Sequence, residues 1–255
     1  MTTLDLTPRS QPAVLWRMIT SQTGHELRLT LRNGEQLLLT LLIPVGILLF
    51  TAGAKVLPGK DLQSIDYLLP GVLALAVMST AFTGLAIATG FERRYGALKR
   101  LGATPLPRFG LVAAKVLSVV VVELLQVIVL CLVGFALGWS AHGSLAWVPL
   151  LMVLGTATFA GLGLLMAGTL RAEVTLAAAN LVYLVMLFLG GLVFPLTSLS
   201  SGLRSVLADL PSAALAHSLR AVLQLGSAPS GHDIAVLVAW SAVGIGAATR
   251  FFRWE

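Results

Sequence analysis

Long runs of apolar residues, separated by short polar segments, fill most of the chain. None of these runs shows the alternation of apolar and polar residues that a membrane β-barrel strand requires. A helix needs roughly 20 apolar residues to cross about 30 Å of hydrocarbon, and in lipid a helix satisfies its own backbone hydrogen bonds. The pattern predicts six membrane-spanning helices, at residues 36–57, 67–91, 109–138, 145–170, 174–194 and 234–252.

The composition supports the same fold class. Of the 255 residues, 57% are hydrophobic and 11% are charged, and the mean hydropathy is +0.91, which excludes an ordinary soluble domain. The first run ends in Ala52-Gly53-Ala54, which resembles a signal-peptide cleavage site, but it begins only at residue 36. We expect a retained helix there, and an all-α polytopic membrane protein with one transmembrane domain over residues 1–255.

Two segments are neither spans nor simple loops. Residues 12–32 mix apolar and basic residues, as a helix lying along the membrane interface would; a tail with a short juxtamembrane helix is the alternative. Residues 195–232 are about half apolar but carry Arg204, Asp209, His217 and Arg220. This second segment predicts a re-entrant outer hairpin of two short amphipathic helices that meet near residues 210–211.

The distribution of Lys and Arg predicts the orientation. Thirteen of the 17 basic residues lie on one side of the predicted spans, in the N-terminal region, the loop after the second span, the turn at residue 171 and the C-terminal tail. Basic residues favour the cytoplasmic side. Both termini are therefore expected in the cytoplasm, residues 195–232 outside, and the protein in the cell (plasma or inner) membrane. The same bias accounts for the net charge of +6, so nucleic acid is not an expected partner.

The sequence contains no recognisable nucleotide-binding, metal-binding or hydrolase motif. Residues 53–60 approach a phosphate-binding loop, but five residues rather than four separate the glycines and Asp61 follows the lysine. The four histidines lack the spacing of metal ligands, and no serine stands in a hydrolase motif. Cys131 is the single cysteine, so no internal disulfide can form. We expect no catalytic, cofactor-binding or metal site in this chain.

Residues 90–110 (GFERRYGALKRLGATPLPRFG) contain the largest predicted cytoplasmic loop between spans, residues 92–108. A membrane protein without an ATP site can use ATP only if a soluble partner pushes on such an element. Glycines bracket a short helical segment in this loop, and Pro105 and Pro107 end it. The charge alone leaves two explanations open, a docking surface or the general bias toward inner basic residues.

The order of residues in this loop resembles a known family. In type-2 ATP-binding-cassette (ABC) exporter permeases, an acidic-basic start, a glycine, a short amphipathic helix and Thr-Pro recur between the second and third spans. Here these are Glu92-Arg93, Gly96, Ala97–Leu101 and Thr104-Pro105. Residues 31–37 with Ile43-Pro44 resemble the entry to the first span in the drug-export branch. Residues 190–195, with Leu210-Pro211 and Leu219-Arg220, resemble the family's outer hairpin.

The resemblance implies a mechanism and partners. The short helix would be the coupling helix that docks on a separate ABC ATPase subunit, which binds ATP and Mg²⁺, and a second permease copy or paralogue would complete the translocation path. The coupling residues that it implies in this chain are Glu92, Arg93, Gly96, Leu98, Leu101, Thr104 and Pro105. The resemblance assigns this chain no enzymatic activity of its own.

One ionisable residue falls in the middle of a predicted span. Glu123 lies about midway along residues 109–138, and Gln126 follows on the same helix face. Polar groups at that depth usually face a bundle interior or a wet cavity. Glu123, Gln126 and Asn180 are therefore candidates for a substrate path; the alternative for all three is helix packing or, for Glu123, a protonated structural carboxyl.

We interpret the sequence as the permease subunit of an ABC exporter that carries a drug-like or lipidic amphiphile. Polysaccharide or glycolipid export on the same scaffold is one alternative. A secondary transporter that uses Glu123 as a proton carrier is the other.

Overall fold

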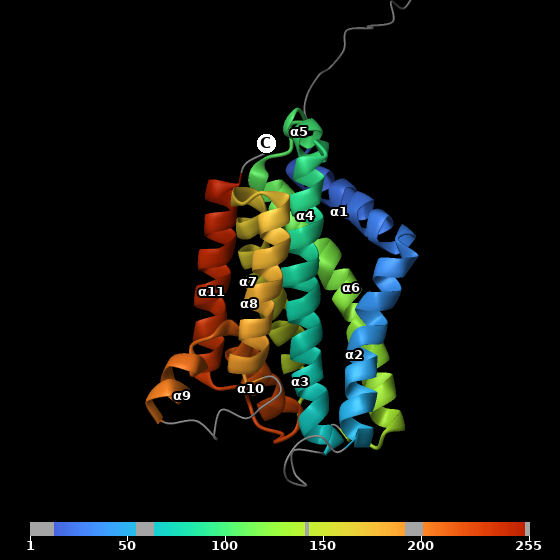
Figure 1. Ribbon diagram of the computed structural model, residues 1–255, viewed down its shortest axis with the longest axis vertical. Coiled ribbons are helices and arrows are strands. Elements are labelled where there is room, and N and C mark those ends of the chain that lie inside the picture. Colours follow the sequence, from blue (N-terminus) through green and yellow to red (C-terminus); the bar gives the residue numbers. More distant parts are fainter. Residues whose placement is uncertain (1–12, 55–63, 141–142, 192–200, 253–255) are drawn as a thin grey trace, which may run out of the picture.

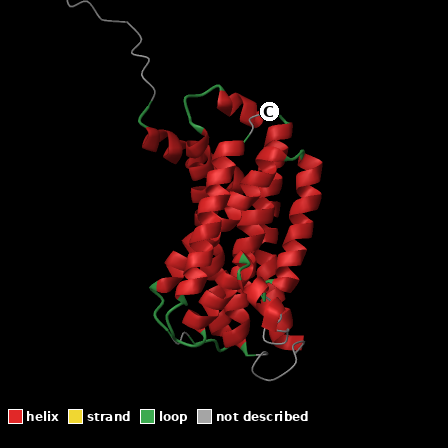
Figure 2. Cartoon of the chain, turned by 90° about the vertical axis from the view of Figure 1, so that its left-hand side faces the viewer, coloured by secondary structure: helices red, strands yellow, loops and turns green. Residues whose placement is uncertain are grey.

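The computed structural model describes residues 13–54, 64–140, 143–191 and 201–252, and every regular element in these ranges is a helix. The helices are α1 (Leu15–Arg32), α2 (Gly34–Ala54), α3 (Ile65–Val77), the π-helical segment η2 (Met78–Gly84), α4 (Leu85–Arg94), α5 (Ala97–Gly102), α6 (Arg108–Ala136), α7 (Trp147–Thr169), α8 (Ala172–Leu189), α9 (Ser201–Ala208), α10 (Pro211–Leu223) and α11 (Gly231–Phe251). The long helices run side by side in one elongated bundle, and the short helices α5 and α9 lie at its two ends (Figures 1 and 2).

Five helical stretches in the described part are long and apolar enough to cross a membrane. They are Ile65–Arg94, which joins α3, η2 and α4, and the helices α6, α7, α8 and α11. A sixth span is obtained if α1 and α2, which are bent by 69° relative to each other, are counted together. The predicted all-α polytopic fold is confirmed. The predicted first span lies on α2; its last residues, 55–57, and residues 192–194 of the fifth lie outside the described part.

Local sequence signals set several helix ends. The Ser64 hydroxyl accepts a hydrogen bond from the Asp66 amide at the start of α3, and Ser230 does the same for the Asp233 amide at the start of α11. These serines satisfy backbone donors that a helix start leaves open. Gly96 has a φ of 73°, which lets the chain turn between α4 and α5.

The centre of the bundle is α7, which packs along α11. A side-chain carbon added at Gly161 would lie 2.7 Å from the backbone carbon of Gly244, so the two backbones are in direct contact. Beside them, the Thr158 hydroxyl donates to the backbone carbonyl oxygen of Leu237 at 3.0 Å and lies 2.8 Å from the Ser241 hydroxyl. Small residues and hydroxyl hydrogen bonds of this kind hold helices together where lipid removes the hydrophobic driving force.

Replacing Gly161 by Leu should therefore separate α7 from α11. Over-packing of a tight interface costs roughly 1–3 kcal/mol, and we expect a lower melting temperature of the purified protein in detergent. Gly246→Leu in α11 is the matched control, since an added carbon there meets nothing within 4 Å. Equal melting temperatures for the two variants would contradict the contact.

The two ends of the bundle differ. α1, α5 and the end of α11 lie at one end, and α9 and α10 lie at the other (Figure 1). α10 is buried along most of its length and packs against α3, α7 and α11. The described part of residues 195–232 thus contains two helices that meet near residues 209–210. The interfacial position of α1 and the outer position of this hairpin stay predictions.

Candidate coupling and transport site

The short helix α5 is fixed to the rest of the chain by its apolar side. Leu98 is fully buried in a small cluster with Leu106, Leu111 and Phe252, and Met18 of α1 packs against the same cluster. The Thr104 hydroxyl donates to the Leu101 carbonyl at 2.6 Å and so helps to end the helix. The opposite side of α5 is exposed.

The exposed side of α5 and of the turn after it is basic and polar. Lys99, Arg100, Thr104 and Pro105 are all exposed to solvent. Of the predicted coupling residues, Thr104 and Pro105 lie on this surface, Leu101 is half-buried and Leu98 faces inward. The sequence predicted these residues as one group, and the structure divides them between an exposed side and a buried side.

Glu92 and Arg93 also contact their own chain. The Glu92 carboxylate accepts a hydrogen bond from Lys115 Nζ at 2.7 Å, and Arg93 donates to the Leu170 carbonyl oxygen at the end of α7. The next residue, Arg94, pairs with Glu173 at the start of α8. The end of α4 is therefore tied to α6, α7 and α8 directly before the chain enters α5.

Lys115 is the centre of a buried ionic cluster that the sequence did not predict. Its side chain is 1% exposed, and Nζ contacts Glu26 Oε2 of α1 at 2.9 Å as well as Glu92 Oε2 of α4 at 2.7 Å. A buried ammonium group needs such partners, because an unpaired charge out of water is very costly. We call Glu26, Lys115 and Glu92 the ionic cluster. It joins three helices, α1, α4 and α6, close to α5.

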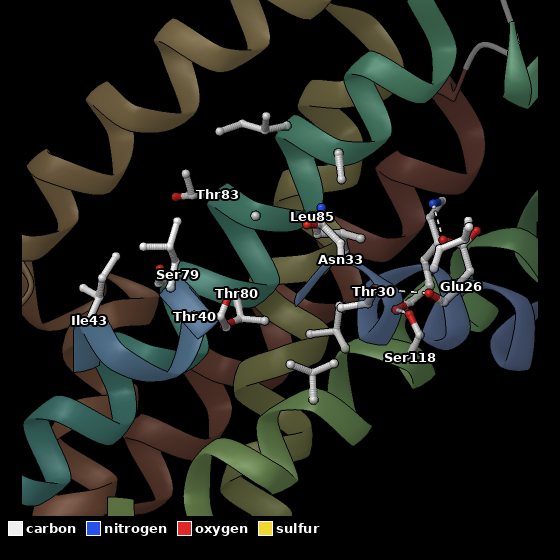
Figure 3. Close-up of a pocket in the computed structure, with 18 of the residues that line it drawn as sticks. Glu26, Thr30, Asn33, Thr40, Ile43, Ser79, Thr80, Thr83, Leu85 and Ser118 are labelled. Atoms are coloured by element: carbon white, nitrogen blue, oxygen red, sulfur yellow. Dashed lines mark hydrogen bonds and ion pairs between the residues drawn. The ribbon is translucent and has the colours of Figure 1, made fainter. Parts of the chain in front are cut away.

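A cavity of about 1,020 Å³ begins at the ionic cluster and extends along α1, α2, η2, α4 and α6. Figure 3 shows Glu26, Thr30 and Ser118 toward one end and Ile43, Ser79 and Thr83 toward the other. The walls combine hydroxyl groups with aliphatic side chains from α2, α4 and α6. A cavity of this size and mixed lining is typical of a site for a small organic molecule.

The π-helical segment η2 supplies the hydroxyl groups of one wall. Ser79, Thr80 and Thr83 all line the cavity. Thr80 donates to the side-chain oxygen of Gln126 at 3.2 Å, and the Gln126 amide donates to the Thr40 carbonyl oxygen at 2.9 Å. Gln126 does not line the cavity itself, but its hydrogen bonds hold Thr80 and Thr40 in the cavity wall. π-Helical turns inside α-helices are often found at functional sites.

Glu123 lies on a different side of α6. Its side chain is 2% exposed, and the Thr156 hydroxyl of α7 is hydrogen-bonded to its Oε2. The same hydroxyl donates to the Met152 carbonyl oxygen at 2.7 Å. A hydroxyl carries one proton, so both contacts form together when the Glu123 carboxyl group supplies a second proton. Glu123 is not among the residues that line the cavity.

Asn180, the third substrate-path candidate, does line the cavity, from α8. Its side-chain amide donates to the Leu176 carbonyl oxygen one turn earlier, at 2.8 Å. The three candidates therefore separate: Asn180 lies on the cavity surface, Gln126 lies behind the wall, and Glu123 lies between α6 and α7.

At the opposite end of the bundle, α10 holds two titratable residues. The Arg220 guanidinium group lies 4.2 Å from the Tyr67 ring centre and donates to the Gly191 carbonyl oxygen at 2.7 Å; burial lowers its pKa. The Asp233 carboxylate lies 3.7 Å from Nδ1 of His217 and raises the pKa of that imidazole. These contacts fix α10 to α3 and α11.

Comparison with known proteins agrees with this architecture. Residues 19–223 match the family model described as ABC-2 type transporter. The chain is 23% identical over 227 residues to "Putative transport permease YvfS" of Bacillus subtilis (strain 168), which covers 88% of this chain and 92% of that protein. It is 26% identical over 168 residues to "Probable multidrug ABC transporter permease YbhS" of Escherichia coli (strain K12), which covers 64% of this chain and 44% of that protein.

The matched region runs from α1 to the end of α10 and so includes α5, the ionic cluster and the cavity. Permeases of this family work with an ATP-binding subunit, as the resemblance of the loop at residues 90–110 implies. The chain is a multi-pass membrane protein of the ABC-2 type transporter family, and it is an ABC transporter permease.

Proposed function

We propose that this permease exports a small amphiphilic molecule, drug-like or lipidic, across the cell membrane, together with a second permease copy or paralogue. The cavity carries this proposal, because it combines aliphatic walls with hydroxyl groups and has a charged end. An amphiphile matches both kinds of surface. A polysaccharide chain would need a wall of hydrogen-bonding groups throughout, whereas side chains such as Leu39, Ile43 and Val119 line this cavity.

The contacts of α5 support a route from ATP hydrolysis to the cavity. A push on α5 would reach α4 directly, and Glu92 at the end of α4 is bound through Lys115 to α6 and to Glu26 of α1. All three residues of the ionic cluster also line the cavity. Movement of α5 would therefore move the cavity walls directly, because the ionic cluster both connects the helices and lines the cavity. ATP and Mg²⁺ would bind on the partner ATPase.

Reconstitution tests the function directly. The permease is co-expressed and co-purified with a candidate ABC ATPase and placed in lipid vesicles with a fluorescent amphiphile. We expect accumulation of the amphiphile that requires ATP and is stopped by vanadate. Transport that follows a proton gradient and ignores vanadate would instead support a secondary transporter, and failure to co-purify with any ABC ATPase would refute the assignment of the partner.

The predicted orientation has its own test. Single cysteines at Lys99 of α5 and Ser205 of α9, in a background that lacks Cys131, lie on exposed positions at opposite ends of the bundle. In intact cells an impermeant maleimide should label the cysteine at 205 at once and the cysteine at 99 only after the membrane is broken. Labelling of both positions in intact cells would contradict cytoplasmic termini.

A further inference from the structure

The charges on the cavity wall do not cancel. Among the residues that the structure describes, the formally charged ones that line it are Glu26, Glu92 and Lys115. Lys115 Nζ binds both carboxylates, at 2.9 and 2.7 Å, so one ammonium group faces two carboxylate groups. When all three are ionised, these residues together carry one net negative charge in a largely buried place, where electrostatic attraction is stronger than in water.

The two carboxylates also keep capacity for further hydrogen bonds. Glu26 Oε1 accepts from the Gln22 side chain at 2.8 Å and its Oε2 accepts from Lys115. Glu92 Oε2 accepts from Lys115 at 2.7 Å, and 27% of the Glu92 side chain is exposed. A carboxylate oxygen can accept two hydrogen bonds. A second ammonium group could therefore be bound beside Lys115 without displacing it.

The rest of the cavity fits an apolar body. Aliphatic side chains from four helices line it, including Leu39, Ile43, Leu85 and Val122. The buried hydroxyl oxygen of Thr83, which also lines the cavity, has no hydrogen-bond partner within the part of the chain that the structure describes. Unpaired polar atoms of this kind mark places where a ligand or water is to be expected.

The direction of the cavity matches that of an amphiphile in a membrane leaflet. Its charged end lies near α5, at the predicted cytoplasmic end of the bundle, and its aliphatic walls extend along the membrane-spanning helices. An amphiphile in the cytoplasmic leaflet places its polar head at the boundary and its apolar part toward the midplane. Such a molecule could enter without turning over.

We propose that this cavity is a binding site for cationic amphiphiles, with the ammonium group beside Glu26 and Glu92 and the apolar body along α2, α4 and α6. The proposal rests on the proposed function, since it assumes that the cavity takes amphiphiles. It adds the charge of the substrate and the two residues that recognise it.

Binding to the permease alone, without the ATPase, separates recognition from coupling. The purified chain in nanodiscs is incubated with radiolabelled dodecylammonium or with dodecanol, an uncharged probe of the same chain length, and uptake by empty nanodiscs is subtracted. Glu26→Gln leaves Lys115 paired with Glu92 and removes the net charge. We expect the Kd for dodecylammonium to rise about tenfold, which corresponds to about 1.4 kcal/mol, with no change for dodecanol.

A second variant restores the net charge and tests whether that charge, rather than the contacts of the cluster, determines binding. Glu26→Gln combined with Lys115→Gln leaves Glu92 alone, so the net charge is again that of the wild type. Dodecylammonium should then bind within about threefold of the wild-type affinity. A purely structural role of the cluster gives the opposite result, since the double variant removes more of its contacts. Thr83→Phe, which fills the cavity, should weaken both probes.

Glu173→Gln is the control outside the cavity, because Glu173 is exposed and pairs with Arg94; it should change neither probe. Unchanged dodecylammonium binding in Glu26→Gln would overturn the inference, as would a double variant that binds no better than Glu26→Gln. Equal wild-type affinity for both probes would overturn the preference for cations and leave the proposed function standing. Binding of neither probe by the wild type would overturn both.

Discussion

Leu98→Asp should cost this permease both its stability and its ATPase, whereas reversing the charge of the neighbouring Lys99 and Arg100 should cost the ATPase alone. Leu98 is fully buried against Leu106, Leu111 and Phe252. A carboxylate in that apolar cluster loses its hydration without gaining a partner there. Removing a buried leucine side chain alone costs roughly 2–5 kcal/mol, so we expect a clearly lower melting temperature of the isolated permease.

The charge reversal acts on the other side of the same helix. Lys99 and Arg100 are exposed, and contacts of exposed charges contribute little to stability, so Lys99→Glu with Arg100→Glu should lower the melting temperature far less than Leu98→Asp. If the ATPase docks on this surface, co-purification should fall at least tenfold, because like charges opposed across an interface cost several kcal/mol. Arg204→Glu is the matched control, an exposed basic residue at the opposite end of the bundle.

Two outcomes would change this assignment. A Leu98→Asp protein that melts like the wild type but no longer binds the ATPase would place Leu98 on the docking side. A charge-reversed protein that still co-purifies with the ATPase and still transports would remove the basic side of α5 from the interface. Both measurements use the same purified protein, so stability and association are read together.

Hydropathy predicted the spans because each helix must be apolar over its full length, a property that a single sequence displays directly. Because hydropathy reads only the residues of the helix itself, it did not predict that α10 is buried. That helix carries Arg220 and His217, which suggested an amphipathic surface, yet it is buried along most of its length. Arg220 is accommodated by the Tyr67 ring and the Gly191 carbonyl oxygen. Such partners are not visible in the polarity of the helix itself.

The ionic cluster was missed for a related reason. The sequence counts Lys115 as one more basic residue at the inner edge of a span. Its partners are Glu26, 89 residues away, and Glu92, 23 residues away. A lysine among apolar residues does indicate that a carboxylate should be near, but the pattern along the chain does not say which one.

The sequence predicted where the coupling residues lie along the chain, but not which of them are buried and which are exposed. The glycine at 96 and the short helix after it are local features, and the structure has both. An amphipathic turn has an apolar side, but the sequence cannot tell whether that side meets a partner or the chain's own core. Phe252, at the far end of the sequence, contributes to the cluster that covers Leu98, and this contact assigns the apolar side to the permease itself.

Glu123 and Gln126 illustrate the same limit inside the membrane. Their spacing places them on similar faces of α6, yet Glu123 meets Thr156 of α7, whereas Gln126 meets Thr80 of η2 and Thr40 of α2. α6 is packed on more than one side, so residues one turn apart contact different neighbours. Glu123 therefore makes a contact with α7, whereas Gln126 supports one wall of the cavity.

Glu123→Gln should be nearly silent for transport, and Glu123→Leu should reduce stability. The glutamine keeps the size of the side chain and a donor for the Thr156 hydroxyl oxygen, so that hydroxyl can still donate to the Met152 carbonyl oxygen. Leucine leaves the Thr156 hydroxyl with one partner fewer in a buried place, a loss of about 1–3 kcal/mol. A proton-coupled transporter that used Glu123 would behave differently, since glutamine cannot carry a proton and transport would stop.

Melting temperature and vesicle transport, measured for both variants beside the wild type, separate the two roles. Full stability of Glu123→Gln with lost transport would revive the proton carrier, and unchanged transport at wild-type rate would leave Glu123 as a structural contact between α6 and α7.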